Sequence, residues 1–276
     1  MDSRNEVREF LASRRARITP EQAGLSAYGG NRRVPGLRRE EVAMLAGVSV
    51  DYYTRLERGN LIGVSENVLD ALSRALNLDE AERAHLFDLA RAANTTPRAR
   101  RRPARQQVRP GVRRVLDALV GAPAFVFNGR LDILHANQLG HALYSEMYTD
   151  PGRPGNHARF LFLNPRANRF WPDWDKAANE TVALLRIEAG RNPHDRGLSD
   201  LIGELSTRST EFRVRWAAHN VRFHRTGIKQ MHHPQVGDLT LSWEVLDITA
   251  DTGLIIVVYT AEPNTPSRDG LDLLSS

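Results

Sequence analysis

Apolar side chains recur at every third or fourth position in five short segments of residues 1–95, the spacing of amphipathic helices. Gly47 ends the second segment, while Ser49 and Ser65 begin the third and fourth, as helix-stop and N-cap residues do. The pattern predicts an all-α domain of five helices. The predicted helices cover residues 6–17, 38–46, 49–59, 65–78 and 79–94.

After residue 110 the pattern becomes a mixture of helices and strands. Two apolar runs flank Asn128-Gly129, a dipeptide typical of β-hairpins. One helix opened by Pro172 and another capped by Ser199 are expected among several between residues 165 and 219. Further helices are predicted over residues 111–120 and 137–148.

The end of the chain is predicted to be β, with strands over residues 226–233, 238–249 and 253–261. The second of these alternates apolar and polar residues, which indicates one buried face, whereas the third is an unbroken apolar run typical of a central strand. Residues 111–276 are therefore expected to form an α+β domain with an antiparallel sheet and helices gathered on one side.

Residues 94–110 separate the two patterns and contain six arginines and three prolines, but no acidic residue. This composition indicates a linker, which is either a solvated tether or a cationic strap along a phosphate backbone. The domains are therefore expected at residues 1–95 and 111–276, with the Arg/Pro-rich linker at 96–110.

Composition narrows the class of protein. The chain of 276 residues is 41% hydrophobic, as globular proteins are, and without cysteine it has no disulfide, thiolate nucleophile or cysteine-based zinc site. With no long apolar run and a charged N-terminus, we expect a cytoplasmic protein. Residues 1–110 hold 20 arginines against 14 acidic residues, while the remainder is nearly balanced. This asymmetry is typical of a polyanion-binding domain, although solvated surface charge is the plainer alternative.

The stretch from residue 40 to 59 has the packing pattern of two crossed helices. Ala43 allows close approach, and Gly47 supplies the positive φ of the turn. Tyr53 and Leu56 are expected to pack inward. Such a helix presents its remaining face to the DNA major groove, so the pattern predicts a helix-turn-helix. The outward residues are Val50, Asp51, Tyr52, Thr54 and Arg55.

Residues 1–95 resemble the XRE-type helix-turn-helix of the phage repressors. Their segment RRVPGLRREEVAMLAGVSVDYYTRLERG, residues 32–59, is more similar still to the actinobacterial MmyB-like regulators. The resemblance implies that Arg39 holds a phosphate and that Glu57 pairs inside with Arg14 or Arg15 of the first helix. It also implies that three residues of the second crossed helix face bases: Val50, Asp51 and Arg55.

Two differences from the phage repressors change which bases the second crossed helix is expected to recognise. Tyr53 replaces the usual branched aliphatic residue, and Val50 with Asp51 replace the amides that would read adenine. The base specificity of better-known members therefore does not carry over to this chain.

The chemistry of the outward residues suggests a role for each. Arg55 has donors for O6 and N7 of guanine, and Val50 can meet a thymine methyl. Asp51 either accepts from a cytosine amino group or, as we favour, orients Arg55 four residues on. The candidate base contacts are Val50, Asp51, Tyr52 and Arg55. The candidate phosphate contacts are Arg32, Arg33, Arg38, Arg39 and Ser49, with ordinary solvated charge as the alternative for the arginines.

In the second domain, NGRLDILHANQLGHALY resembles the opening of a PAS-like domain, and RWAAHNVRFHRTGIKQMHHPQVGDLTLSWEVL with VVYTAEPNTPS is similar to MmyB-like ligand-binding domains. The resemblance implies a sheet with helices over one face, an apolar cavity and a hydrophobic ligand such as a fatty acid. Plain core is the alternative for the tryptophans. The candidate ligand contacts are Trp171, Trp174, Trp216, His219, Arg222, Lys229, His233 and Trp243.

These features favour a regulator of transcription that binds a DNA operator as a homodimer and responds to a small hydrophobic effector. No cofactor and no metal site are expected, because adjacent His232 and His233 on a strand point to opposite faces. Two alternatives remain: a nonspecific nucleic-acid-binding protein, or an enzyme with His219 and His233 as acid–base groups.

Overall fold

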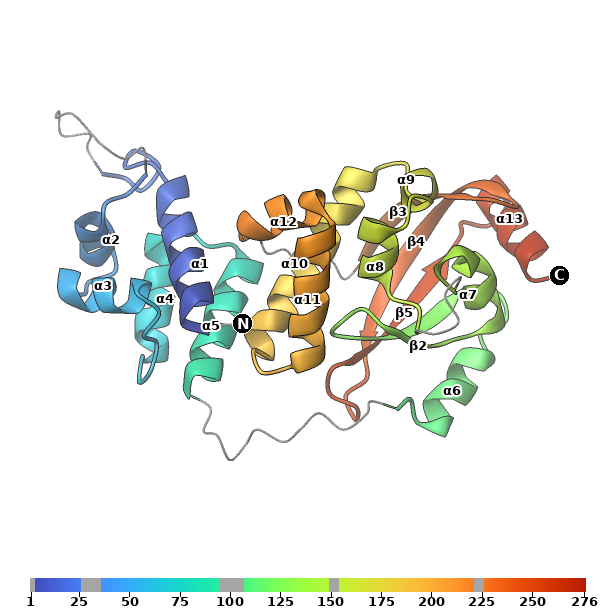
Figure 1. Ribbon diagram of the computed structural model, residues 1–276, viewed down its shortest axis with the longest axis horizontal. Helices are drawn as coiled ribbons and strands as arrows, with labels where there is room; N and C mark the ends of the chain where they lie inside the picture. The colour runs from blue at the N-terminus through green and yellow to red at the C-terminus, as the bar shows by residue number, and fades with distance from the viewer. Residues whose placement is uncertain (1–2, 26–35, 95–106, 149–153, 221–225) are drawn as a thin grey trace. The chain divides into compact units, whose positions relative to one another are not determined.

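The computed structural model describes residues 3–25, 36–94, 107–148, 154–220 and 226–276 (Figure 1). The chain divides into two compact units. Unit 1 holds Met1–Arg102, Arg186–Ser199 and Arg215–Arg222, and unit 2 holds Pro103–Leu185, Asp200–Val214 and Phe223–Ser276. None of the described helices is both long and apolar enough to cross a membrane.

The first part of unit 1 contains the five predicted helices. They pack around a core to which each contributes apolar side chains, among them Phe10, Tyr53 and Leu86, all fully buried. The all-α prediction is confirmed. The helices are α1 (Ser3–Arg17), α2 (Arg39–Leu45), α3 (Val50–Glu57), α4 (Glu66–Ala75) and α5 (Glu80–Asn94).

The turn between α2 and α3 follows the predicted chemistry. Gly47 has a φ of 65°, in the left-handed region, and the Val48 N–H donates to the Ala43 carbonyl at 2.9 Å. The Ser49 hydroxyl caps α3 by accepting from the Tyr52 N–H at 3.1 Å. These local bonds set the angle at which α3 leaves the turn.

Unit 2 is built on a five-stranded antiparallel sheet in the order β2-β1-β5-β4-β3 (Figure 1). The unbroken apolar run of β5 lies at the centre, as predicted, because a strand covered on both faces needs apolar side chains on both. The strands are β1 (Ala124–Asn128), β2 (Ile133–Ala136), β3 (Thr226–His233), β4 (Gly237–Asp247) and β5 (Leu254–Thr260).

Side chains of β1 alternate between two apolar layers. Phe125 and Phe127 point into the main core, which is covered by several helices, whereas Val126 packs with Leu116 on the opposite face. Leu116 belongs to α6 (Pro110–Asp117), so the expectation that the helices gather on one side was wrong for this helix. The remaining helices are α7 (Gln138–Leu143), α8 (His157–Leu163), α9 (Ala167–Phe170), α10 (Trp174–Arg191), α11 (Arg196–Arg208), α12 (Thr210–Ala217) and α13 (Pro266–Leu274).

Three local predictions in this half of the chain need correction. Asp195, not Ser199, begins α11: its carboxylate accepts from the Leu198 N–H at 3.3 Å, and Ser199 lies inside the helix. The β1–β2 hairpin forms, but the Asn128 side chain closes a longer loop by accepting from the backbone of Arg130 and Asp132 at 3.0 Å each. The chain also ends in a helix, α13, rather than in β structure.

Gly47 and Gly59 both have positive φ but differ in their surroundings. A Cβ on Gly47 would meet open space, whereas one on Gly59 would collide with the backbone of Arg4 in α1. We expect Gly47→Ala to lower the free energy of unfolding by about 1–2 kcal/mol through left-handed strain alone. Gly59→Ala should lower the free energy of unfolding by clearly more, since α1 must move to make room for the added methyl group. The loss in free energy of unfolding of each variant is measured from the urea dependence of hydrogen exchange in α1. Equal losses in the two variants would contradict the close approach of Gly59 to α1.

Candidate nucleic-acid interface and ligand site

The exposed side of α3 carries the candidate base contacts. Tyr53 and Leu56 are fully buried, while Val50 is 44% exposed and Asp51 and Arg55 are exposed. Tyr52 lies half-buried between these two sides. The helix therefore buries Tyr53 and Leu56 and presents to solvent a mainly polar face on which Val50 is apolar.

Arg55 is oriented by a ring. Its guanidinium lies 4.9 Å from the centroid of Tyr52, three residues earlier on the same helix. Among the described residues no ion pair joins Asp51 to Arg55, so our preference for Asp51 as the orienting group was wrong. An arginine three residues after a tyrosine is a sequence signal for this stack, because such residues are neighbours on a helix.

A buried carboxylate ties α3 to the two helices before it. Glu57 is 2% exposed, and its Oε1 accepts from Arg15 Nε at 2.9 Å. Its Oε2 accepts from Arg39 of α2. Of the two partners left open for Glu57, Arg15 is confirmed, whereas Arg14 lies 3.1 Å from Glu82. Three helices are therefore joined through one side chain.

Arg39 is both anchored and accessible. The hydrogen bond that its guanidinium donates to Glu57 raises the pKa of this group, which therefore stays charged, and half of the Arg39 side chain is exposed. Arg38, at the start of α2, is exposed, and its Nη1 lies 3.7 Å from Glu40. Arg32 and Arg33 lie outside the described residues.

The polar face of α3 continues beyond the predicted set. Arg58, exposed at the end of α3, lies seven residues after Asp51, two turns along the same side of the helix. Met44 and Ile62 are 62% and 60% exposed, although both are large apolar residues. The position of Arg58, seven residues after Asp51, could have identified it from the sequence as part of this face. The exposure of Met44 and Ile62 could not be predicted from helical periodicity.

In unit 2, three of the candidate ligand contacts lie together. Lys229 Nζ is 5.4 Å from the Trp171 ring and 5.1 Å from the Trp243 ring. The same ammonium is 3.0 Å from Glu180, a partner that sequence analysis missed. Burial and, less strongly, the charge of Lys229 lower the pKa of nearby His157 to about 3, so that this ring is neutral at pH 7.

The remaining candidates have other surroundings. Trp174 packs edge-on to Phe162, and its indole N–H donates to the Leu161 carbonyl at 3.1 Å. His233 is buried, with a ring nitrogen 3.1 Å from the Ala142 carbonyl. Trp216 and His219 belong to unit 1, and Arg222 lies outside the described residues. The two histidines proposed for an enzyme therefore belong to different compact units.

Aromatic rings fill the core beside Lys229, Trp171 and Trp243. The Tyr144 ring lies 4.5 Å from Phe125, and its hydroxyl is 2.7 Å from that of Tyr259. A surface hollow of about 580 Å³ on unit 2 is lined by polar side chains such as Arg169 and His232 together with the apolar side chains of Met231 and Leu239. This hollow is partly polar, unlike the apolar cavity that the resemblance implies.

Crossed helices with a glycine turn and an outward polar face define a helix-turn-helix, followed here by an antiparallel α+β domain. A family model for a helix-turn-helix domain matches residues 6–86, and that of the MmyB-like transcription regulator ligand binding domain matches residues 108–274. The chain belongs to the MmyB-like transcription regulators. No curated protein matches it.

Proposed function

We propose that the protein binds operator DNA in the cytoplasm with α3 in the major groove, and that Val50, Asp51, Tyr52 and Arg55 contact base edges. The observation that carries this proposal is the division of α3, which buries Tyr53 and Leu56 completely and leaves the other side exposed. The polar face of α3 is not buried within the described fold, and an α-helix fits into the major groove of DNA.

Each outward residue of α3 has a specific role in the proposed recognition of bases. Arg55, stacked on Tyr52, reads guanine through O6 and N7 with little loss of rotamer freedom. Val50 contacts a thymine methyl. Because Asp51 does not hold Arg55, its carboxylate is free to accept from a cytosine amino group at the neighbouring base pair.

The phosphates are bound by the residues around the start of α2 and α3. Arg39, held by Glu57, presents a half-exposed guanidinium at a fixed position, and Arg38 adds a second charge. Ser49 uses its oxygen to cap α3 and keeps its hydroxyl hydrogen for a phosphate oxygen. Arg32 and Arg33 complete the proposed set.

Arg55→Ala tests the assignment of α3. The probes are a duplex selected by the wild-type protein from a randomised library and a scrambled duplex of the same composition. We expect the preference for the selected duplex to fall by about tenfold to a hundredfold, since a bidentate arginine–guanine contact discriminates by about 1–3 kcal/mol. Weak binding to both duplexes should remain, with its dependence on salt, because the phosphate contacts persist.

Arg74→Ala is the matched control, because Arg74 is an exposed arginine that belongs to α4 and not to α3. Its preference should stay at the wild-type value. An unchanged preference in Arg55→Ala would refute the assignment. A wild-type protein that selects no sequence at all would favour the nonspecific nucleic-acid-binding alternative.

We further propose that the ligand of unit 2 is a hydrophobic molecule with a carboxylate, such as a fatty acid, and that Lys229 binds the carboxylate. Lys229 is partly buried between two tryptophan rings beside an aromatic core. Its ammonium has three donors, of which Glu180 takes one. A carboxylate at this point would meet a fixed charge in a setting of low dielectric, while the alkyl chain replaces water on apolar surface.

Lys229→Met should weaken binding of sodium myristate at least tenfold, because it removes the charge but keeps most of the length of the side chain. Lys176→Met is the matched control: it removes the only other lysine, which is exposed on α10. Tetradecanol, which lacks the carboxylate, should bind both variants equally. Native mass spectrometry and tryptophan fluorescence measure these affinities, and equal myristate binding by all three proteins would exclude the role of Lys229.

We also propose that the protein binds its operator as a homodimer. One recognition helix as short as α3, eight residues long, contacts too few base pairs to find one site in a genome, whereas two half-sites about one helical turn apart suffice. Light scattering of the complex should therefore give the mass of two chains plus one duplex, and the selected duplex should contain an inverted repeat. One chain per duplex would contradict the proposal.

A further inference from the structure

Unit 1 combines sequence from both matched regions of the chain. Besides α1 to α5 it includes Arg186–Ser199 and Arg215–Arg222, which lie within the region matched by the ligand-binding family model. The boundary between the units falls inside α10, after Leu185. Two pieces of the ligand-binding sequence therefore fold with the helix-turn-helix.

Arg186 is the centre of the contacts that hold these pieces. Its side chain is fully buried, with a guanidinium that donates to Glu6 of α1 and to the Trp216 carbonyl. The same group lies 2.8 Å from His219 Nδ1 and 4.1 Å from the centroid of the Trp216 ring. One cation thus links α1, the end of α10 and the end of α12.

His219 extends this set of contacts. Its Nε2 lies 2.8 Å from Glu9 Oε2, and its carbonyl accepts from Arg14 of α1. Its backbone has a φ of 53°, an uncommon conformation for a residue other than glycine, which is kept only where the surroundings hold it. We refer to these residues together as the Arg186 cluster: Glu6, Glu9, Arg14, Arg186, Trp216 and His219.

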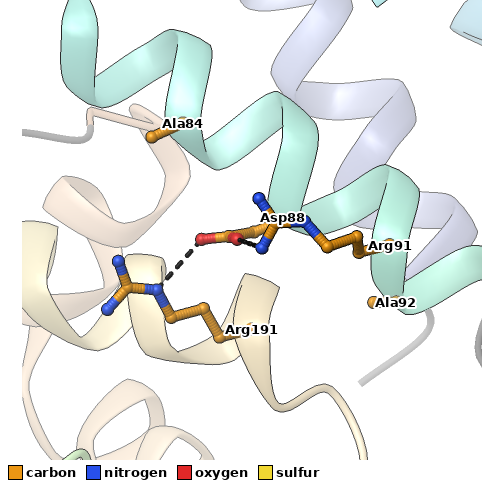
Figure 2. A pocket seen from close by; sticks show the side chains of 5 residues that line it. All are labelled: Ala84, Asp88, Arg91, Ala92 and Arg191. Carbon is orange, nitrogen blue, oxygen red and sulfur yellow. Dashed lines mark hydrogen bonds and ion pairs between the residues drawn. The ribbon is translucent and has the colours of Figure 1, made fainter. Parts of the chain in front are cut away.

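Two further contacts lie alongside the cluster. Gly190 of α10 leaves no room for a side chain, because a Cβ there would lie 2.6 Å from the His85 ring of α5. Asp88 of α5 accepts from Arg191 Nε at 3.0 Å and from Arg91 at 2.7 Å, as Figure 2 shows. The end of α10 is therefore held against α5 by close packing as well as by charge.

The Arg186 cluster brings together two arginines and two glutamates, and its Arg14 is also paired with Glu82 at 3.1 Å. Burial by itself would raise the pKa of Glu6, but the hydrogen bond of His219 and the charge of Arg186 lower it to about 2, so the carboxylate is ionised. Buried charges of this kind gain little over an apolar interface, because they regain water when the contact opens. Such a contact specifies one geometry and can still open, which is what a two-state connection requires.

We propose that the Arg186 cluster is a latch: its closed state fixes α1 for DNA binding, and its opening carries the state of the ligand-binding domain to the helix-turn-helix. The latch and the DNA-binding face meet in α1, where Arg14 contacts the cluster and the next residue, Arg15, holds Glu57 of α3. Arg186 is thus a positioning residue for α3. The inference rests on the proposed DNA-binding function.

Linkage makes this testable without knowledge of the ligand. If opening the latch weakens DNA binding, DNA must oppose opening by the same factor. The probe is the duplex selected by the wild-type protein, and hydrogen exchange of the full chain is followed at residues 186–199 and 215–220. We expect the duplex to slow exchange in both segments at least fivefold in the wild type.

In the Arg186→Met variant, hydrogen exchange should be fast in both segments, with or without the duplex. This variant should also bind the duplex at least fivefold more weakly than the wild type. Arg186→Lys, which keeps the charge beside Glu6, should lie between them. Arg196→Met, at an exposed arginine of the same segment, should match the wild type in both measurements. Far-UV circular dichroism checks that α1 to α5 remain folded in each variant.

The results separate the latch from the proposed function. If the wild type selects no duplex, the DNA-binding function falls, and this inference falls with it. If selection succeeds but the duplex leaves exchange in the two segments unchanged, only the latch is overturned. Slowed exchange that persists in Arg186→Met would mean that DNA covers the segments directly, which also overturns it.

Discussion

The helix-turn-helix depends on one buried carboxylate. Glu57 lies in α3 but is neutralised by Arg15 of α1 and Arg39 of α2, so that only one arrangement of the three helices satisfies it. A buried charge that loses a partner costs about 3–5 kcal/mol, far more than the pair gains when intact. The position of Arg39 and the way in which α1 and α2 are held to α3 follow from this constraint.

The same physical device recurs in both compact units. Lys229 is paired with Glu180 among aromatic rings in unit 2, and Arg186 is paired with Glu6 in unit 1. In each place an interior cation pairs with a carboxylate and lies against an aromatic ring. Such pairs contribute less to stability than apolar packing would, but they define orientation.

Local signals predicted local structure well. The five helices of the first domain, the caps at Ser49 and Ser65 and the positive φ of Gly47 depend on neighbours in sequence. The errors arose where two local signals competed. Asp195 took the cap that Ser199 was expected to provide, and the Asn128 side chain built a longer loop than its glycine neighbour suggested. The signal for α13, a capping Thr265 followed by Pro266, was present but overlooked.

The sequence by itself determined which residues of α3 point inward and which point outward, since helical periodicity alone sorts Tyr53 and Leu56 from Val50, Asp51 and Arg55. Only the tertiary structure decided which partners the charged side chains take: Arg15 rather than Arg14 for Glu57, Glu180 for Lys229, and Glu6 for Arg186, 180 residues away. Periodicity is a property of neighbours along the chain, whereas a buried charge pairs with whatever the folded chain brings within about 3 Å, and no local pattern contains that distance.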